Sequence, residues 1–188
     1  MSDMREIRLN PDPDLHPRLA LLLAQMEDVR GDLKTQAERW EDEELDLAVV
    51  PGFLSPGELL LHIAEAEAWW LRIVLAGQGE GDPPRLSAEA LIPFLQDEEG
   101  EPEAGERPLV DYLAVLDDTR AWTRDHLAGL EAADLAKEFP FTDRKGQDYR
   151  FSMAWILHHL VEHEAHHRGQ LALMRRLLDT LRELPAAD

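Results

Sequence analysis

The sequence contains no cysteine, so disulfide bonds, thiolate metal ligands and a cysteine nucleophile are all excluded. Any bound metal ion must therefore be held by nitrogen and oxygen atoms. Basic residues are also scarce, with 19 lysines and arginines against 39 acidic residues and a formal net charge of -20. Such a charge repels phosphate backbones and anionic membrane surfaces, which argues against nucleic acid as a partner. Acidity of this kind need not indicate a function, since it also simply keeps a protein soluble.

Long apolar runs are missing as well. Nowhere do about 18 uncharged apolar residues follow one another, and residues 1–14 are charged and contain prolines, unlike a signal peptide. We therefore expect a soluble, cytoplasmic protein with no membrane partner. The chain has 188 residues, of which 44% are hydrophobic, enough for a sizeable core. The expected organisation is a single domain over residues 1–188.

Histidine is abundant in one short segment, where five of the chain's eight histidines fall between positions 158 and 167. Residues four apart on a helix point in nearly the same direction. One row therefore contains His159, His163 and His167, and another contains His158 and His166. Imidazole nitrogens at this spacing suit zinc, nickel, copper or iron. The alternative is that these histidines are merely packed or solvated.

A further histidine stands in a segment with a well-marked helix start. Ser55 and Glu58 form the pattern of a capping box, and Pro56 suits the first helical position. Two turns later, His62 is surrounded by apolar residues, so its ring should face the interior of a helical assembly. A buried imidazole needs a partner, either a backbone carbonyl or a metal ion. When His62 is considered together with the C-terminal histidines, metal ligation is the preferred interpretation of its role.

Hydrophobic periodicity predicts long helices over residues 15–40, 56–76, 108–130 and 153–181. Residues 78–107 are acidic and rich in glycine and proline, and we interpret them as a surface excursion with a short helix at 88–95. Aromatic residues on both sides of positions 143–146 predict a small hairpin before the last helix. The expected fold is all-α, a four-helix bundle of the up-down-down-up type with long connections.

Two segments carry a resemblance to a known family. The capped Leu-Leu-Leu-His62-Ile-Ala-Glu segment and the segment from His159 to Gln170 resemble the DinB-like, or DinB/YfiT-like, metal-binding four-helix proteins. The resemblance extends from about Leu15 to about Leu178. It implies that His62, His163 and His167 hold a divalent metal ion, with His159 as a substitute ligand if the register differs by one turn. It also allows a homodimer.

Three protein ligands would leave a coordination position open, as catalytic metal sites do. An open ion can produce hydroxide from water or hold a thiol as thiolate. DinB-like relatives include thiol transferases, so the preferred function is a metal-dependent thiol S-transferase or hydrolase acting on a low-molecular-weight thiol or another small molecule. Zinc is the expected ion, with nickel, iron and manganese as alternatives. The alternative function is a non-catalytic metal-binding or stress-associated helical module.

Three neighbours of these histidines receive smaller roles. Gln170 could add a polar group beside the site, and Arg168 is expected to pair with Glu164 across one helical turn. Trp69 lies two turns after His62 and could line a pocket, although an ordinary core tryptophan is the favoured interpretation.

Overall fold

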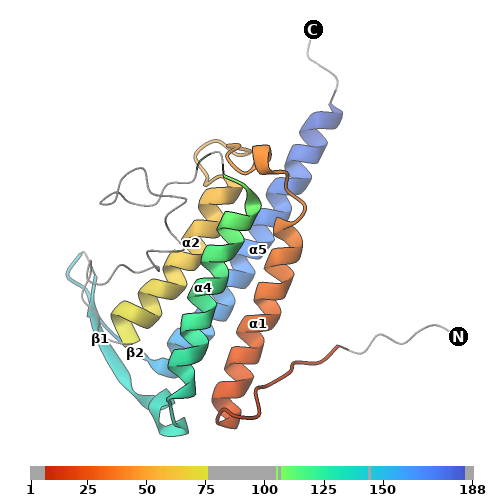
Figure 1. Cartoon of the computed structure of the whole chain (residues 1–188). Coiled ribbons are helices and arrows are strands. Elements are labelled where there is room, and N and C mark those ends of the chain that lie inside the picture. Colours follow the sequence, from red (N-terminus) through yellow and green to blue (C-terminus); the bar gives the residue numbers. More distant parts are fainter. Residues whose placement is uncertain (1–6, 76–104, 106, 144, 185–188) are drawn as a thin grey trace, which may run out of the picture.

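The computed structural model describes residues 7–75, 105, 107–143 and 145–184. In this part of the chain, four long helices lie side by side, with α1 and α5 running in one direction and α2 and α4 in the opposite direction (Figure 1). Their bounds are α1 Pro17–Ala37, α2 Pro56–Ala68, α4 Leu109–Ala128 and α5 Met153–Glu183. The helices predicted from periodicity are therefore present, with ends that differ by a few residues.

The predicted cap of α2 is confirmed, and a serine also caps the predicted start of α5. The Ser55 hydroxyl accepts from the Glu58 amide at 3.2 Å, and the Glu58 carboxylate accepts from the Ser55 amide at 2.6 Å, which completes the capping box of α2. At the start of α5, the Ser152 hydroxyl accepts from the Trp155 amide at 3.2 Å. These local contacts fix where the two histidine-bearing helices begin.

Close packing brings the first turn of α2 against α4. A Cβ atom on Gly57 would lie 2.6 Å from the hydroxyl of Tyr112, which is fully buried. Only glycine permits this approach. Tyr112 also donates to the carbonyl of Gly105 at 3.2 Å. The contact therefore holds the beginnings of α2 and α4 together.

The core consists of two hydrophobic clusters stacked along the helices. One cluster contains Leu33, Leu60 and Leu116, and the other contains Leu19, Leu71 and Ile156 among its members. On each helix, a buried charged residue lies in sequence between members of the two clusters. We call these four residues the ionic layer: Arg30 on α1, Glu67 on α2, Arg120 on α4 and Glu164 on α5.

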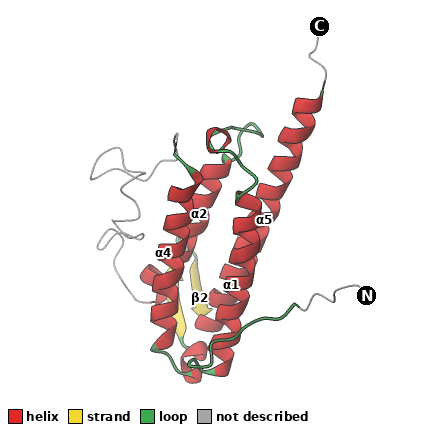
Figure 2. Ribbon diagram, turned by 45° about the vertical axis from the view of Figure 1, so that its right-hand side comes forward, coloured by secondary structure: helices red, strands yellow, loops and turns green. Residues whose placement is uncertain are grey.

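A π-helical segment, η2 (Trp69–Leu75), continues α2, and a hairpin precedes α5. The strands β1 (Glu138–Thr142) and β2 (Asp148–Ser152) pair antiparallel, with Phe139 opposite Phe151. The hairpin therefore forms where aromatic periodicity predicts it, at the end of the helices where α2 finishes (Figure 2). The π-helical turn was not predicted, because a periodicity of 3.6 residues continues into this segment.

Two further expectations concern the rest of the chain. The predicted excursion at 78–107, including the short helix at 88–95, lies outside the described residues except at positions 105 and 107. None of the described helices combines the length and the apolarity that crossing a bilayer requires.

Candidate metal centre

Three histidines from two helices meet on one side of the molecule. The Nε2 atom of His163 lies 3.2 Å from Nε2 of His62 and 3.1 Å from Nε2 of His167. One nitrogen from each ring lies within 4.8 Å of the other two, and all three rings are half-buried. We call His62, His163 and His167 the histidine triad. These are the residues that the sequence and the family resemblance single out.

The geometry of the two helices explains this convergence. His163 and His167 are four residues apart on α5, so their rings lie on the same face one turn apart. His62 reaches them from α2, which packs directly against α5. The ring centroids of His62 lie 5.1 Å from His163 and 4.9 Å from His167.

Burial and mutual proximity keep the imidazoles of His163 and His167 neutral. Burial, followed by the neighbouring His167 and His62, lowers the pKa of His163 to about 3. Burial also lowers the pKa of His167, although the hydrogen bond to Gln170 opposes that effect. At neutral pH, the His163 and His167 rings are therefore uncharged and retain nitrogen lone pairs, the form in which histidine binds metal ions.

A hydrogen bond from Gln170 defines the tautomer of His167. The Gln170 carbonyl oxygen lies 2.6 Å from Nδ1 of His167, and it can only accept, so Nδ1 carries the hydrogen. The Nε2 atom of His167, which faces His163, consequently carries no hydrogen and has a free lone pair. The amide nitrogen of Gln170 lies 3.1 Å from Nε2 of His166 and donates to it, which holds the amide in this orientation. Gln170 thus orients a triad ring in the way that outer partners orient metal ligands.

The triad fits a divalent cation better than it fits internal hydrogen bonds. A single hydrogen on His163 Nε2 can satisfy only one of the two nitrogens that face it. Two nitrogens bound to one ion at about 2.0–2.1 Å lie about 2.9–3.4 Å apart at octahedral or tetrahedral angles, which matches both observed separations. Half-exposed rings also leave room for a further ligand from solvent.

Comparison with known proteins gives the family. The family model described as mycothiol-S-transferase matches residues 21–180. The chain belongs to the mycothiol-S-transferase family. This family is DinB-like, so the resemblance inferred from the two histidine segments is confirmed.

Of the two other comparisons, one supports the fold, and neither gives further information on function. A search of curated protein sequences gives no match to this member of the mycothiol-S-transferase family. Among solved structures, the crystal structure of a conserved protein from Enterococcus faecalis is similar, with a TM-score of 0.61 and 15% sequence identity. The alignment covers 85% of this chain and 96% of that chain.

The structure of this mycothiol-S-transferase family member places His159 outside the triad. Its ring stacks on Trp155 at a centroid distance of 4.9 Å and an interplanar angle of 5°. The Trp70 ring lies 5.4 Å from the His159 ring at an interplanar angle of 72°. The centroids of His159 and His163 are 5.8 Å apart. His159 therefore continues the histidine row along α5 but faces aromatic residues, whereas the converging nitrogens belong to the triad.

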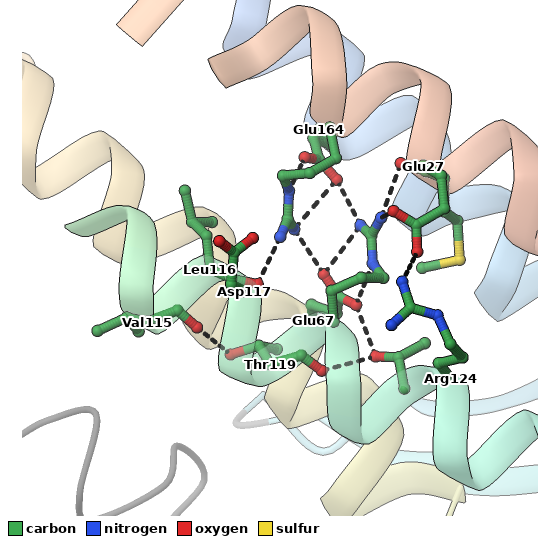
Figure 3. Close-up of polar contacts among 12 residues, drawn as sticks. Glu27, Glu67, Val115, Leu116, Asp117, Thr119, Arg124 and Glu164 are labelled. Carbon is green, nitrogen blue, oxygen red and sulfur yellow. Dashed lines mark hydrogen bonds and ion pairs between the residues drawn. The ribbon is translucent and has the colours of Figure 1, made fainter. Parts of the chain in front are cut away.

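The ionic layer and the triad have neighbouring members on two helices. Glu164 directly follows His163 on α5, and Glu67 follows His62 by five residues on α2. Figure 3 shows that its acidic and basic groups are joined by hydrogen bonds and ion pairs. Arg120 donates to Glu67 at 2.9 Å and to Glu164 at 2.8 Å. Arg30 donates to Glu67 at 2.8 Å and forms a short contact with Glu164.

Further donors and acceptors satisfy the remaining atoms of the ionic layer. The Thr123 hydroxyl donates to Glu67 at 2.6 Å. Arg30 and Arg120 also donate to backbone carbonyls, those of Leu116 and Met26. Burial raises the pKa of Glu67, but Arg120 and Arg30 more than reverse this and bring it to about 2. The layer joins all four helices and thereby sets the register between the two that carry the triad.

This layer corrects one prediction and explains what sequence reasoning missed. Arg168 does not pair with Glu164. It donates to Asp32 at 2.5 Å, because Glu164 is buried between Arg30 and Arg120. A signal for the layer was present, since each of its members is a charged residue on the apolar face of its helix.

Proposed function

We propose that the protein is a metal-dependent thiol S-transferase that uses mycothiol or a closely similar small thiol. The observation that carries the proposal is the convergence of three imidazole nitrogens, with Nε2 separations of 3.1 and 3.2 Å, in a chain of the mycothiol-S-transferase family. His62, His163 and His167 would hold the ion. Zinc is the ion that we expect from a purely nitrogenous ligand set with open positions.

The chemistry that a divalent ion supplies when bound is a lowered pKa for a thiol or a water molecule. The protein's part is to hold the three rings in one orientation and to keep His163 and His167 in their neutral form. Gln170 maintains the tautomer of His167, and the ionic layer maintains the register of α2 against α5. In the reaction, the thiol loses its proton to solvent, a carbon–sulfur bond forms at the electrophilic carbon, and the bond to the leaving group breaks.

The proposal includes the architecture that positions this site. We propose that residues 1–188 form one domain and that its helices make a four-helix bundle of the up-down-down-up type. The opposed directions of the helices and the contacts of α1 with α5 and of α2 with α4 support this. In such bundles, metal sites are commonly built from side chains of facing helices.

The test combines metal analysis with an assay of turnover. Protein purified without a histidine tag is analysed for bound metal, and is then assayed with mycothiol and other small thiols against an electrophile. We expect close to one ion per chain, and loss of both metal and turnover in His163→Ala. His158→Ala is the matched control, because His158 is exposed on the same helix and pairs with Glu162. Turnover that persists unchanged in His163→Ala would refute the metal mechanism.

The same assay decides between this function and its alternatives. Hydrolysis of simple esters or amides without thiol transfer would favour a hydrolase, since a lowered pKa of water serves that reaction. Stoichiometric metal without turnover of any substrate would favour a non-catalytic metal-binding module. The family match favours thiol transfer among these outcomes.

A further inference from the structure

Half of the aromatic residues of this chain gather beside the triad. The chain has 5 tryptophans, 5 phenylalanines and 2 tyrosines. Six of these twelve form one connected set that we call the aromatic wall: Trp69 and Trp70 on η2, Phe141, Tyr149 and Phe151 on the hairpin, and Trp155 on α5. The hairpin and α5, which are consecutive in the sequence, and the distant segment η2 therefore contribute to one surface.

A ladder of stacked rings runs from the hairpin to His159, whose ring is tilted by 56° against that of the triad member His163. Tyr149 stacks on Phe151 at 5.6 Å and 10°, and Phe151 stacks on Trp155 at 4.7 Å and 22°. Trp155 stacks on His159 at 4.9 Å and 5°, and His159 lies 5.8 Å from the His163 ring. Flat rings thus follow one another without a break from the hairpin to a triad member.

A second line of rings, from η2, packs against the ladder. Trp70 meets Phe151 at 5.0 Å and Trp155 at 5.7 Å, both nearly edge to face. Trp69 meets Phe141 at 5.2 Å and Trp70 at 4.8 Å. The two tryptophans belong to the π-helical segment, a local departure from α-helical geometry that is frequent at functional sites. Two adjacent residues of this π-helical segment are therefore both members of the aromatic wall.

Exposure distinguishes this set from ordinary core packing. Trp155 is 42% exposed and Tyr149 is 43% exposed, whereas Tyr112 in the core is fully buried. Trp69, Trp70, Phe141 and Phe151 are each half-buried. A connected set of large apolar side chains left open beside a reactive site is typical of a ligand surface.

We propose that the aromatic wall binds the aromatic group of the electrophile that receives the thiol. This inference rests on the proposed function, because it assigns the second substrate of the same reaction. The electrophilic carbon must come within about 3–3.5 Å of the sulfur held at the triad, so the rest of the electrophile must lie on a surface that borders the triad. The aromatic wall borders it through His159, and uncharged flat rings bind other flat rings by offset or edge-to-face contact.

The decisive experiment compares two electrophiles with one thiol. The aromatic substrate is 1-chloro-2,4-dinitrobenzene and the small non-aromatic substrate is iodoacetamide. In each reaction a carbon–sulfur bond forms, a halide ion leaves and the thiol proton passes to solvent. In Trp155→Ala, we expect kcat/KM for the aromatic substrate to fall roughly threefold to tenfold, the effect of one lost aromatic pair, with little change for iodoacetamide.

Two further variants control for structure. Trp155→Phe keeps a ring and should restore most of the aromatic preference. Leu173→Ala removes an exposed apolar side chain from the same helix, away from the wall, and should change neither substrate. An equal loss for both electrophiles in Trp155→Ala would overturn the inference, as would a rise in KM for the thiol alone, since the wall would then bind the thiol.

A binding measurement separates this inference from the proposed function. Equilibrium dialysis with 2,4-dinitroaniline, which carries the same ring without the halide leaving group, measures the wall whether or not the protein is an active transferase. We expect binding that Trp155→Ala weakens and Leu173→Ala does not. Absence of turnover together with this pattern would refute the transferase and keep the wall as an aromatic-binding surface. No binding to wild type, or a dimer that dissociates in Trp155→Ala, would overturn the inference.

Discussion

The ionic layer and the histidine triad are polar clusters that share helices α2 and α5, and their side chains are paired in opposite ways. In the ionic layer, two carboxylates face two guanidinium groups, and every contact joins opposite charges or a donor with an acceptor. In the triad, three groups of the same kind face one another at 3.1 and 3.2 Å. The first cluster is complete within the protein. The second would be completed by a bound cation.

This difference predicts a role in stability for the ionic layer and a role in metal binding for the triad. Buried charges are costly unless each is paired, and the ionic layer pairs its charges across four helices. The triad is half-exposed, and one nitrogen of each ring lies within 4.8 Å of the other two. Removing a member should therefore harm folding in the first case and metal binding in the second.

The largest effect should come from breaking the ionic layer. Arg120→Met leaves Glu67 and Glu164 buried with one cation between them, and we expect a loss of about 3–5 kcal/mol in the free energy of unfolding. Urea denaturation measures this. Arg124→Met is the matched control, because Arg124 is half-exposed and its pair with Glu27 should contribute no more than about 1 kcal/mol. Equal losses in the two variants would show that the layer is not a stabilising unit.

The next effect concerns stabilisation by metal. A ligand that binds only the folded state at 100 to 1,000 times its Kd adds about 2.7–4.1 kcal/mol to stability. Wild type should therefore gain in Tm when zinc is added, whereas His163→Ala should show no such gain, and the two metal-free proteins should melt at similar temperatures. Differential scanning calorimetry with and without zinc tests this. A gain in Tm that survives His163→Ala would place the ion elsewhere.

A smaller effect, on metal affinity, should follow from removing Gln170, the hydrogen-bond partner of His167. Gln170→Ala removes the acceptor that holds the His167 tautomer, and we expect metal affinity to fall about 10- to 100-fold while the protein stays folded. Isothermal titration with zinc gives the Kd. Gly169→Ala is the control on the adjacent residue, since an added Cβ there would meet nothing within 4 Å. If the control weakens zinc binding equally, the loss does not arise from the His167 tautomer.

The smallest effect is the pH dependence of the metal-free protein. In the unfolded chain a histidine takes up a proton near its ordinary pKa of 6.5, whereas the pKa of folded His163 is lowered to about 3. The His163 contribution to stability is therefore fully present above pH 6.5 and is lost as the pH falls toward 3. Glu67, with a pKa of about 2 against 4.5, acts at lower pH, from 4.5 downward.

Denaturation between about pH 7 and pH 5 tests the histidine contribution separately, because Glu67 remains ionised in both states over most of that interval. In the presence of a chelator, wild type should lose stability as the pH falls. His163→Ala should lose less, although solvent screening at this half-exposed site keeps the difference small. Identical slopes in the two proteins would contradict the lowered pKa of His163.

Local patterns predicted much of the fold and the candidate ligands. The Ser55–Glu58 cap and the Ser152 cap lie within a few residues of the groups they bind, so the sequence displays them directly. The spacing of His163 and His167 likewise depends only on helical geometry. The π-helical turn at Trp69–Leu75 was not predicted, because the same residues are compatible with a continued α-helix.

Such local patterns could not predict contacts between residues that are distant in the sequence. Glu164 pairs with Arg30 and Arg120 rather than with Arg168 four residues away, because helix packing buries it among side chains from α1 and α4. The stacking of His159 on Trp155, one turn away, could be expected from spacing. The contact of His159 with Trp70, and of Trp70 with Phe151, depends on how α2, the hairpin and α5 meet.

By itself, the sequence determined the nitrogen and oxygen chemistry of any metal site, the helices, and the two candidate ligands that share one turn of α5. Tertiary structure decided that His62 meets those ligands, that Gln170 leaves a lone pair directed at them, and that the aromatic wall borders them. The physical reason is range. Helical spacing and capping act within a few residues, whereas a metal centre and a substrate surface require groups that only the packing of separate elements brings within a few ångströms.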